Sequence, residues 1–79
     1  MARVLLFGPL RDLAGWRERQ IEAGSIEALR AAISAEDPEL GLALAGPGVQ
    51  VALDQALVRG DRAVGAGSEV AFLPPMSGG

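Results

Sequence analysis

Apolar residues follow one another without interruption near the start of the chain, over residues 4–7. A run of this length that ends at a glycine and a proline predicts a strand over residues 2–8, buried on most of its sides. Pro9 suits the first turn of a helix, and a short apolar face follows it at Leu10, Leu13 and Ala14. We therefore expect a short helix after the first strand, with Gly15 as its end.

The next segments carry the patterns of a second strand and a longer helix. Charged and apolar residues mix over residues 16–22, which predicts a solvated strand that pairs with the first strand as a hairpin. Ser25 is a good N-cap, and apolar residues follow at helical spacing, at Ile26, Leu29, Ala32 and Ile33. These features predict the main helix over residues 26–35. Asp37-Pro38 is a second cap, and the residues after it form either a short helix or an irregular loop.

Three short strands separated by turns complete the pattern, over residues 49–53, 56–58 and 70–73. The order strand, strand, helix, strand, strand, strand predicts an α+β fold, with a mixed sheet and one main helix across a face. The small fold that matches this order best is the ubiquitin-like β-grasp. We expect residues 1–73 to form that domain and residues 74–79 to form a flexible, extended tail that ends in Gly-Gly.

The tail offers a chemical group that needs no side chain. Pro74 and Pro75 cannot donate to a sheet ladder, so the chain should leave the domain in an extended form. Gly78 and Gly79 could pass through a narrow channel in another protein and present a bare carboxylate at the tip. A carboxylate is a poor electrophile, so attack on it requires activation. The alternative is that Gly-Gly is a disordered end without a role.

The composition disfavours self-sufficient catalysis. The chain lacks cysteine, histidine, lysine, tyrosine, threonine and asparagine. It therefore has no disulfide, thiolate zinc site or cysteine nucleophile, and a serine nucleophile would lack its base. We expect no metal site, no bound cofactor and no side-chain active site.

The distribution of charged and apolar residues argues against nucleic acids and membranes as binding partners. The net charge is −3 and all seven cations are arginines, without the basic stripe that nucleic-acid modules show. No apolar run approaches the roughly 20 residues of a membrane span, and the first residues lack the pattern of a secretory leader. We therefore expect a cytoplasmic protein that binds neither nucleic acid nor membrane.

Three segments together resemble one family of sulfur carriers. EVAFLPPMSGG at residues 69–79 resembles the C-terminal signature of the molybdopterin synthase small subunit family. VLLFGPLRDLAG at residues 4–15 and VALDQALV at residues 51–58 resemble that family's first strand and helix and its central strand pair. One departure is Asp54, where the family commonly has asparagine; both residues tolerate turns.

The resemblance implies a reaction sequence that ends on Gly79. An E1-like enzyme would adenylate its carboxyl with ATP, and a sulfur donor would convert it to a thiocarboxylate. The loaded tail would then enter the large subunit of molybdopterin synthase, a heterotetramer, and give sulfur to cyclic pyranopterin monophosphate. Alternatives are a carrier for thiamine, tRNA thiolation or cysteine synthesis, a ubiquitin-like protein modifier, and a binding module with an inert tail.

The resemblance also implies which residues meet the partner. Phe7, Leu57 and Leu73 match family positions that pack against it, although each could instead be a core residue. If the first and last strands pair, Phe7 and Leu73 would lie side by side at the root of the tail. The tail itself would add further partner contacts, at Pro74, Pro75, Met76 and Ser77. Trp16 is either an interface anchor or a packing residue.

Overall fold

The computed structural model describes residues 1–75. Along this part of the chain the elements are β1 (Ala2–Leu6), α1 (Pro9–Ala14), β2 (Glu18–Ile21), α2 (Ile26–Glu36), α3 (Pro38–Leu44), β3 (Gln50–Leu53), β4 (Ala56–Val58) and β5 (Glu69–Leu73). The predicted order of strands and main helix is confirmed. The predicted boundary between domain and tail after residue 73 stays a prediction, because residues 76–79 lie outside the described residues.

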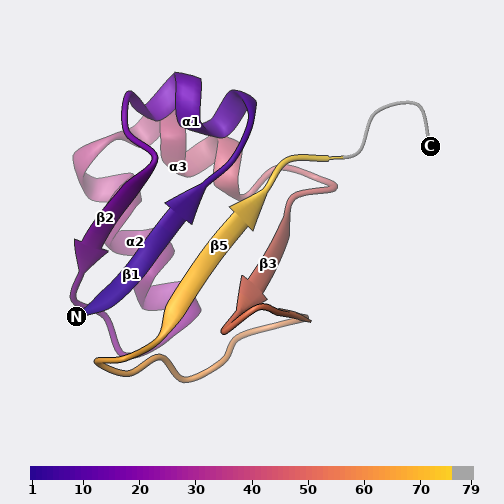
Figure 1. Ribbon diagram of the computed structural model, residues 1–79. Coiled ribbons are helices and arrows are strands. Elements are labelled where there is room, and N and C mark those ends of the chain that lie inside the picture. Colours follow the sequence, from indigo (N-terminus) through magenta and orange to yellow (C-terminus); the bar gives the residue numbers. More distant parts are fainter. Residues whose placement is uncertain (76–79) are drawn as a thin grey trace.

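The strands form one mixed sheet in the order β2-β1-β5-β3-β4. The two strands from opposite ends of the chain, β1 and β5, are parallel neighbours in its middle, and the remaining pairs are antiparallel. Helices α2 and α3 lie behind the sheet, and α1 lies beyond the end of β1 (Figure 1). This topology confirms the predicted β-grasp, including the pairing of the first and last strands.

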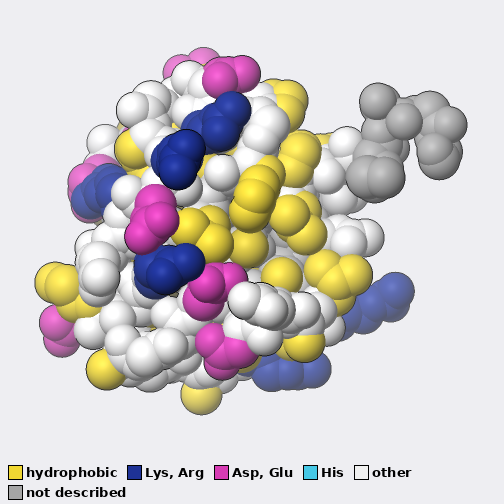
Figure 2. All heavy atoms as spheres, in the orientation of Figure 1, with side chains coloured by type: hydrophobic (Ala, Val, Ile, Leu, Met, Phe, Trp, Pro, Cys, Tyr) yellow, Lys and Arg dark blue, Asp and Glu magenta, His cyan; other side chains and the backbone are white. Residues whose placement is uncertain are grey.

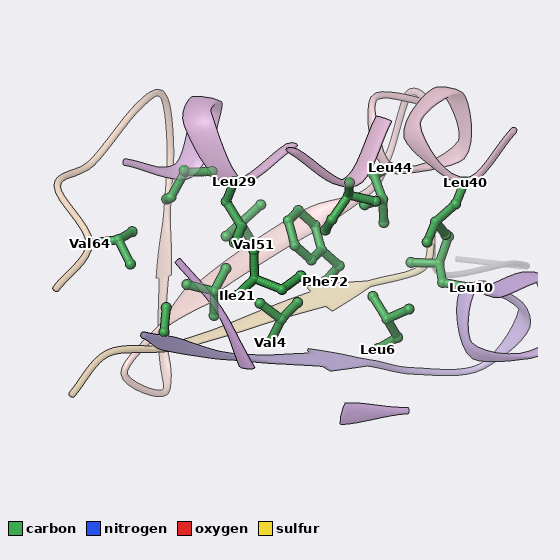
Figure 3. Close-up of a cluster of buried hydrophobic side chains, with 14 residues drawn as sticks. Val4, Leu6, Leu10, Ile21, Leu29, Leu40, Leu44, Val51, Val64 and Phe72 are labelled. Carbon is green, nitrogen blue, oxygen red and sulfur yellow. The ribbon is translucent and has the colours of Figure 1, made fainter. Parts of the chain in front are cut away.

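The core fills the space between the sheet and its helices (Figure 3). Its least exposed members come from both layers and include Val4, Ile26, Leu29, Leu40, Leu44, Val70 and Phe72. The prediction that the first strand is buried on most sides is wrong. Along β1 buried residues alternate with more exposed ones, because among the described residues no helix covers the other face of the sheet.

Side-chain caps fix where the helices begin. The Ser25 hydroxyl accepts a hydrogen bond from Ala28 N at 3.1 Å, which confirms the predicted start of α2. The Asp37 carboxylate accepts one from Leu40 N at 3.1 Å. This second cap makes the following residues the helix α3 rather than an irregular loop. The pairing of β1 with β2 is also confirmed, although α1 lies between the two strands in the sequence.

Candidate functional site: the open sheet face and the root of the tail

The sheet face that no described helix covers carries a continuous apolar surface. Cross-strand register joins Leu5 to Ala71, Ala71 to Ala52 and Ala52 to Leu57, in a row across four strands. Phe7, the residue directly after β1, and Leu73, the last residue of β5, follow two positions after Leu5 and Ala71, so both belong to the same face. We call the six residues Leu5, Phe7, Ala52, Leu57, Ala71 and Leu73 the open-face patch. Figure 2 shows apolar side chains gathered over this part of the sheet.

Phe7 and Leu73 occupy the end of the patch from which the tail leaves. Leu6 is the direct partner of Phe72 in the parallel β1–β5 pairing, so Phe7 and Leu73 are the next residues of these two segments. Both Leu6 and Phe72 are buried on the helix side, which turns their successors to the open side. The structure thus brings these two predicted site residues to the root of the tail.

The predicted site residues differ in how far they are exposed. Phe7 is 44% exposed and Leu57 is 63% exposed, whereas the core residue Phe72 is 0% exposed. Leu73 is half-buried. Phe7 and Leu57 are therefore surface residues rather than core residues. Their contact with a partner stays a prediction.

Charged residues border the patch at the end far from the tail. Arg3 lies between two carboxylates, with Nε 3.4 Å from Glu18 Oε2 and Nη2 3.2 Å from Glu69 Oε1. These pairs are partly exposed and contribute little to the free energy of folding. Their effect is to limit the apolar surface on one side, so that the patch is continuous only toward the tail.

Two loops approach the first residues of the tail. Pro74 is half-buried beside Gly8, which joins β1 to α1, and Pro75 lies beside Gly48, which precedes β3. Figure 1 shows the tail leaving β5 next to the loop that leads into β3. The predicted site residues Met76, Ser77, Gly78 and Gly79 lie outside the described residues.

One hollow in the described part of the chain lacks the groups that side-chain catalysis needs. A hollow of about 420 Å³ lies at the β3–β4 edge, and its lining includes Arg30, Val49, Gln50, Val58 and Arg59. The Arg30 guanidinium sits 5.9 Å from the centre of the Phe72 ring and donates to Glu27 Oε2 at 3.0 Å. The lining residues include no carboxylate or hydroxyl group, so the hollow holds no general base or nucleophile.

Residues 1–75 contain neither a cluster of metal-ligating side chains nor a helix that could span a membrane. No three histidine, cysteine, aspartate or glutamate side chains in this range come together in a way that could hold a metal ion. None of the helices described there has the length and apolar character needed to cross a membrane.

Trp16 packs against the core, and the centre of its ring lies 5.2 Å from the Arg19 guanidinium. These contacts favour a packing role for Trp16 over a role as an interface anchor.

Sequence reasoning missed part of the site. The run of apolar residues in β1 concealed Leu5 as a member of the open-face patch, although its spacing of two from Phe7 was a signal. Ala71 has the same spacing from Leu73. For Gly8 and Gly48 the local sequence held no signal of a contact with the tail, because each contact joins segments that are distant along the chain.

Two sequence comparisons match the chain over all or nearly all of its length. The sequence model of the ThiS family matches residues 4–79. The molybdopterin synthase sulfur carrier subunit of Escherichia coli is 37% identical over 81 aligned positions, which cover 100% of both chains.

Two solved structures are similar in fold. The small archaeal modifier protein 1 of Methanosarcina acetivorans superposes with a TM-score of 0.86 at 19% identity, over 99% of this chain and 95% of that one. This likeness confirms the predicted ubiquitin-like β-grasp. A complex of subunits 1 and 2 of the molybdopterin-converting factor of Helicobacter pylori matches with a TM-score of 0.72 at 25% identity, over 99% of this chain and 97% of that one.

Proposed function

The chain belongs to the ThiS family, and on this basis we propose that it is a sulfur carrier whose reactive group is the C-terminal carboxyl of Gly79. The observation that carries the proposal is the full-length similarity to a molybdopterin synthase sulfur carrier subunit, together with the Gly78-Gly79 ending. The protein would supply no side-chain catalysis. Its own part is to dock and to deliver the tail.

The chemistry follows from the weakness of a carboxylate as an electrophile. In the proposed sequence an E1-like enzyme lets the Gly79 carboxylate attack the α-phosphate of ATP, which releases pyrophosphate and leaves an acyl-adenylate. Sulfur at the oxidation level of sulfide, supplied by the donor, then attacks the acyl carbon and displaces AMP, which leaves a thiocarboxylate. ATP belongs to the activating enzyme, so the carrier needs no bound cofactor. All of these steps would take place in the cytoplasm.

Docking would use the open-face patch. An apolar surface beside the root of the tail can bind a partner and aim the tail at the partner's active site in one step. We propose the large subunit of molybdopterin synthase as that partner, in a heterotetramer. The Helicobacter pylori complex of two molybdopterin-converting factor subunits supports a partner of this kind. There the thiocarboxylate would give its sulfur to cyclic pyranopterin monophosphate.

A reconstituted assay tests this function. The chain is prepared with a thiocarboxylate at Gly79, mixed with the large subunit and cyclic pyranopterin monophosphate, and molybdopterin is measured. The proposal expects product from the thiocarboxylate form and none from the carboxylate form or from the chain without Gly79. Product from the shortened chain would contradict it. Isopeptide-linked conjugates in cells, or sulfur transfer only into thiamine, thiolated tRNA or cysteine, would favour one of the other carrier or modifier roles.

A further inference from the structure

Gly8 fits closely against the first residue of the tail. Its φ is +57°, in the region that favours glycine, and an ideal Cβ at this position would lie 3.1 Å from Pro74 Cγ. The Gly8 carbonyl also accepts a hydrogen bond from Arg11 N at 3.1 Å. Gly8 is therefore fixed to the start of α1 and leaves just enough room for the proline ring.

Gly48 fits even more closely against the second residue of the tail. Its φ is +85°, and an ideal Cβ would lie 2.9 Å from Pro75 Cβ and 3.2 Å from Pro75 Cγ. The first of these distances is shorter than carbon atoms tolerate without a shift of one of them. An alanine at position 48 would therefore have to displace Pro75 or the loop that precedes β3.

The two glycines approach the tail from opposite neighbours of β5. Gly8 follows β1 and Gly48 precedes β3, and these two strands flank β5 in the sheet. Between them lie two proline rings, whose φ angles are fixed and whose nitrogens form no ladder hydrogen bond. The direction of the chain beyond β5 is thus set by ring contacts with two loops rather than by strand pairing.

We propose that Gly8 and Gly48 are positioning residues that hold Pro74 and Pro75 and so set the direction in which the tail leaves the domain. The effect of this positioning on sulfur transfer rests on the proposed function, whereas the contacts between the glycines and the prolines do not. Residues 76–79 can reach at most about 14 Å from the root. A tilt of the root by about 15° would therefore move the tip by roughly 3–4 Å at full reach, and misplacement of about 1 Å can cost ~100-fold in rate.

The chain supplies matched controls for a test of this inference. Gly15 and Gly60 also have positive φ, +82° and +71°, but an ideal Cβ on either would meet nothing within 4 Å. Alanine adds backbone strain at all four positions, and most at Gly8, whose ψ of −136° lies outside the left-handed helical region of Gly15, with a ψ of 9°. Only at Gly8 and Gly48 does the added methyl group press on a proline of the tail. The φ of Gly48, +85°, is close to those of Gly15 and Gly60, so a difference between Gly48→Ala and these two control variants isolates the contact with the tail.

The first readout is a distance and does not depend on sulfur chemistry. The chain has no cysteine, so spin labels can be placed with Ser77→Cys and Leu42→Cys, the latter at a residue on α3 that is 77% exposed. Electron–electron resonance then measures the distance distribution between the labels. We expect Gly48→Ala to shift or broaden it and Gly60→Ala to leave it unchanged. The same distribution in both variants would overturn the inference.

The second readout is the rate of single-turnover sulfur transfer at saturating large subunit. With the thiocarboxylate form of each variant, Gly8→Ala and Gly48→Ala should react at least tenfold more slowly than the chain without a substitution. Gly15→Ala and Gly60→Ala should stay within twofold of it. Equal rates for all four variants would contradict the positioning role. If the chain without a substitution gives no product while the label distances shift as expected, the proposed function fails and the positioning geometry stands.

A further variant keeps the inference testable if alanine at position 48 prevents folding. Pro75 is exposed and lies outside the sheet, so Pro75→Ala should leave the domain folded. It keeps Cβ, the Pro75 atom nearest to Gly48, but it removes the rest of the ring and restores a freely rotating φ. A broader label distance for Pro75→Ala supports the inference, and an unchanged one overturns it.

Discussion

Asp54 and Glu69 exchange two hydrogen bonds where β3 turns into β4. Glu69 N donates to Asp54 Oδ1 at 2.9 Å, and Asp54 N donates to Glu69 O at 2.8 Å. Asp54 has a φ of +51°, in the left-handed region that aspartate and asparagine enter more readily than most residues. An asparagine side-chain oxygen could accept the same hydrogen bond from Glu69 N. Aspartate in place of the family's usual asparagine therefore keeps this bond.

This exchange makes the choice of residue at position 54 testable. Asp54→Asn should change the free energy of unfolding by less than about 0.5 kcal/mol, whereas Asp54→Ala should lower it by about 2 kcal/mol through a lost hydrogen bond and left-handed strain. Urea denaturation followed by circular dichroism measures both. An alanine variant as stable as the starting chain would contradict the role given to the exchange.

Truncation of two adjacent residues at the end of β5 should lower the free energy of unfolding by different amounts. Phe72 is 0% exposed in the core, so Phe72→Ala should cost about 3–5 kcal/mol of unfolding free energy. For a domain of this size that is a large part of the total. Leu73→Ala, on the open face, should cost about 1 kcal/mol or less. Thermal unfolding of the two variants checks this, and equal losses would contradict the assignment of faces.

The open-face patch should carry the docking energy. Leu73→Asp would leave an unpaired charge in a dry interface and should weaken binding to the large subunit at least tenfold, or by about 1.4 kcal/mol. Leu42→Asp is the matched control, because Leu42 is exposed on α3 and lies outside the patch. Calorimetric titration measures the affinity.

Circular dichroism of both aspartate variants is the folding control. Unchanged affinity of a folded Leu73→Asp variant would show that the patch is not the interface. A variant that is unfolded would show that Leu73 belongs to the core.

Gly78→Val should block entry of the tail into the partner's active site without affecting binding of the domain to the partner. A branched side chain at this position would obstruct a narrow channel around the tail, while the open-face patch stays intact. We expect the variant to bind the large subunit through the patch and to yield no molybdopterin in the reconstituted assay. Normal product formation would contradict the claim that residue 78 must lack a side chain.

The element order was predictable because its signals are local. The cap at Ser25 and the spacing from Ile26 to Ile33 identify α2 without knowledge of the rest of the chain. The faces of β1 were harder to predict. Val4 and Leu6 point to the core, while Leu5 and Phe7 belong to the open-face patch, so both faces are apolar for different reasons. A local pattern cannot distinguish such a strand from one that is buried on both faces.

The contacts at the root of the tail depend on the whole topology. Gly48 lies beside Pro75 because β3 and β5 are neighbours in the sheet. Neither segment by itself has a sequence feature that predicts this contact. The tail motif was the reverse case. Pro74-Pro75 and Gly-Gly are visible in the sequence. Which residues surround the two prolines could be learned only from the fold.

The intact mass of the protein purified from its own cells tests the central claim most directly. The account predicts a species heavier than the encoded chain by the difference between one sulfur and one oxygen atom, with the change located at Gly79. It also predicts that the species disappears when Gly79 is deleted. If cells that are actively making molybdopterin contain this chain only with an unmodified carboxylate, including in complex with its partners, then it does not carry sulfur on its C-terminus.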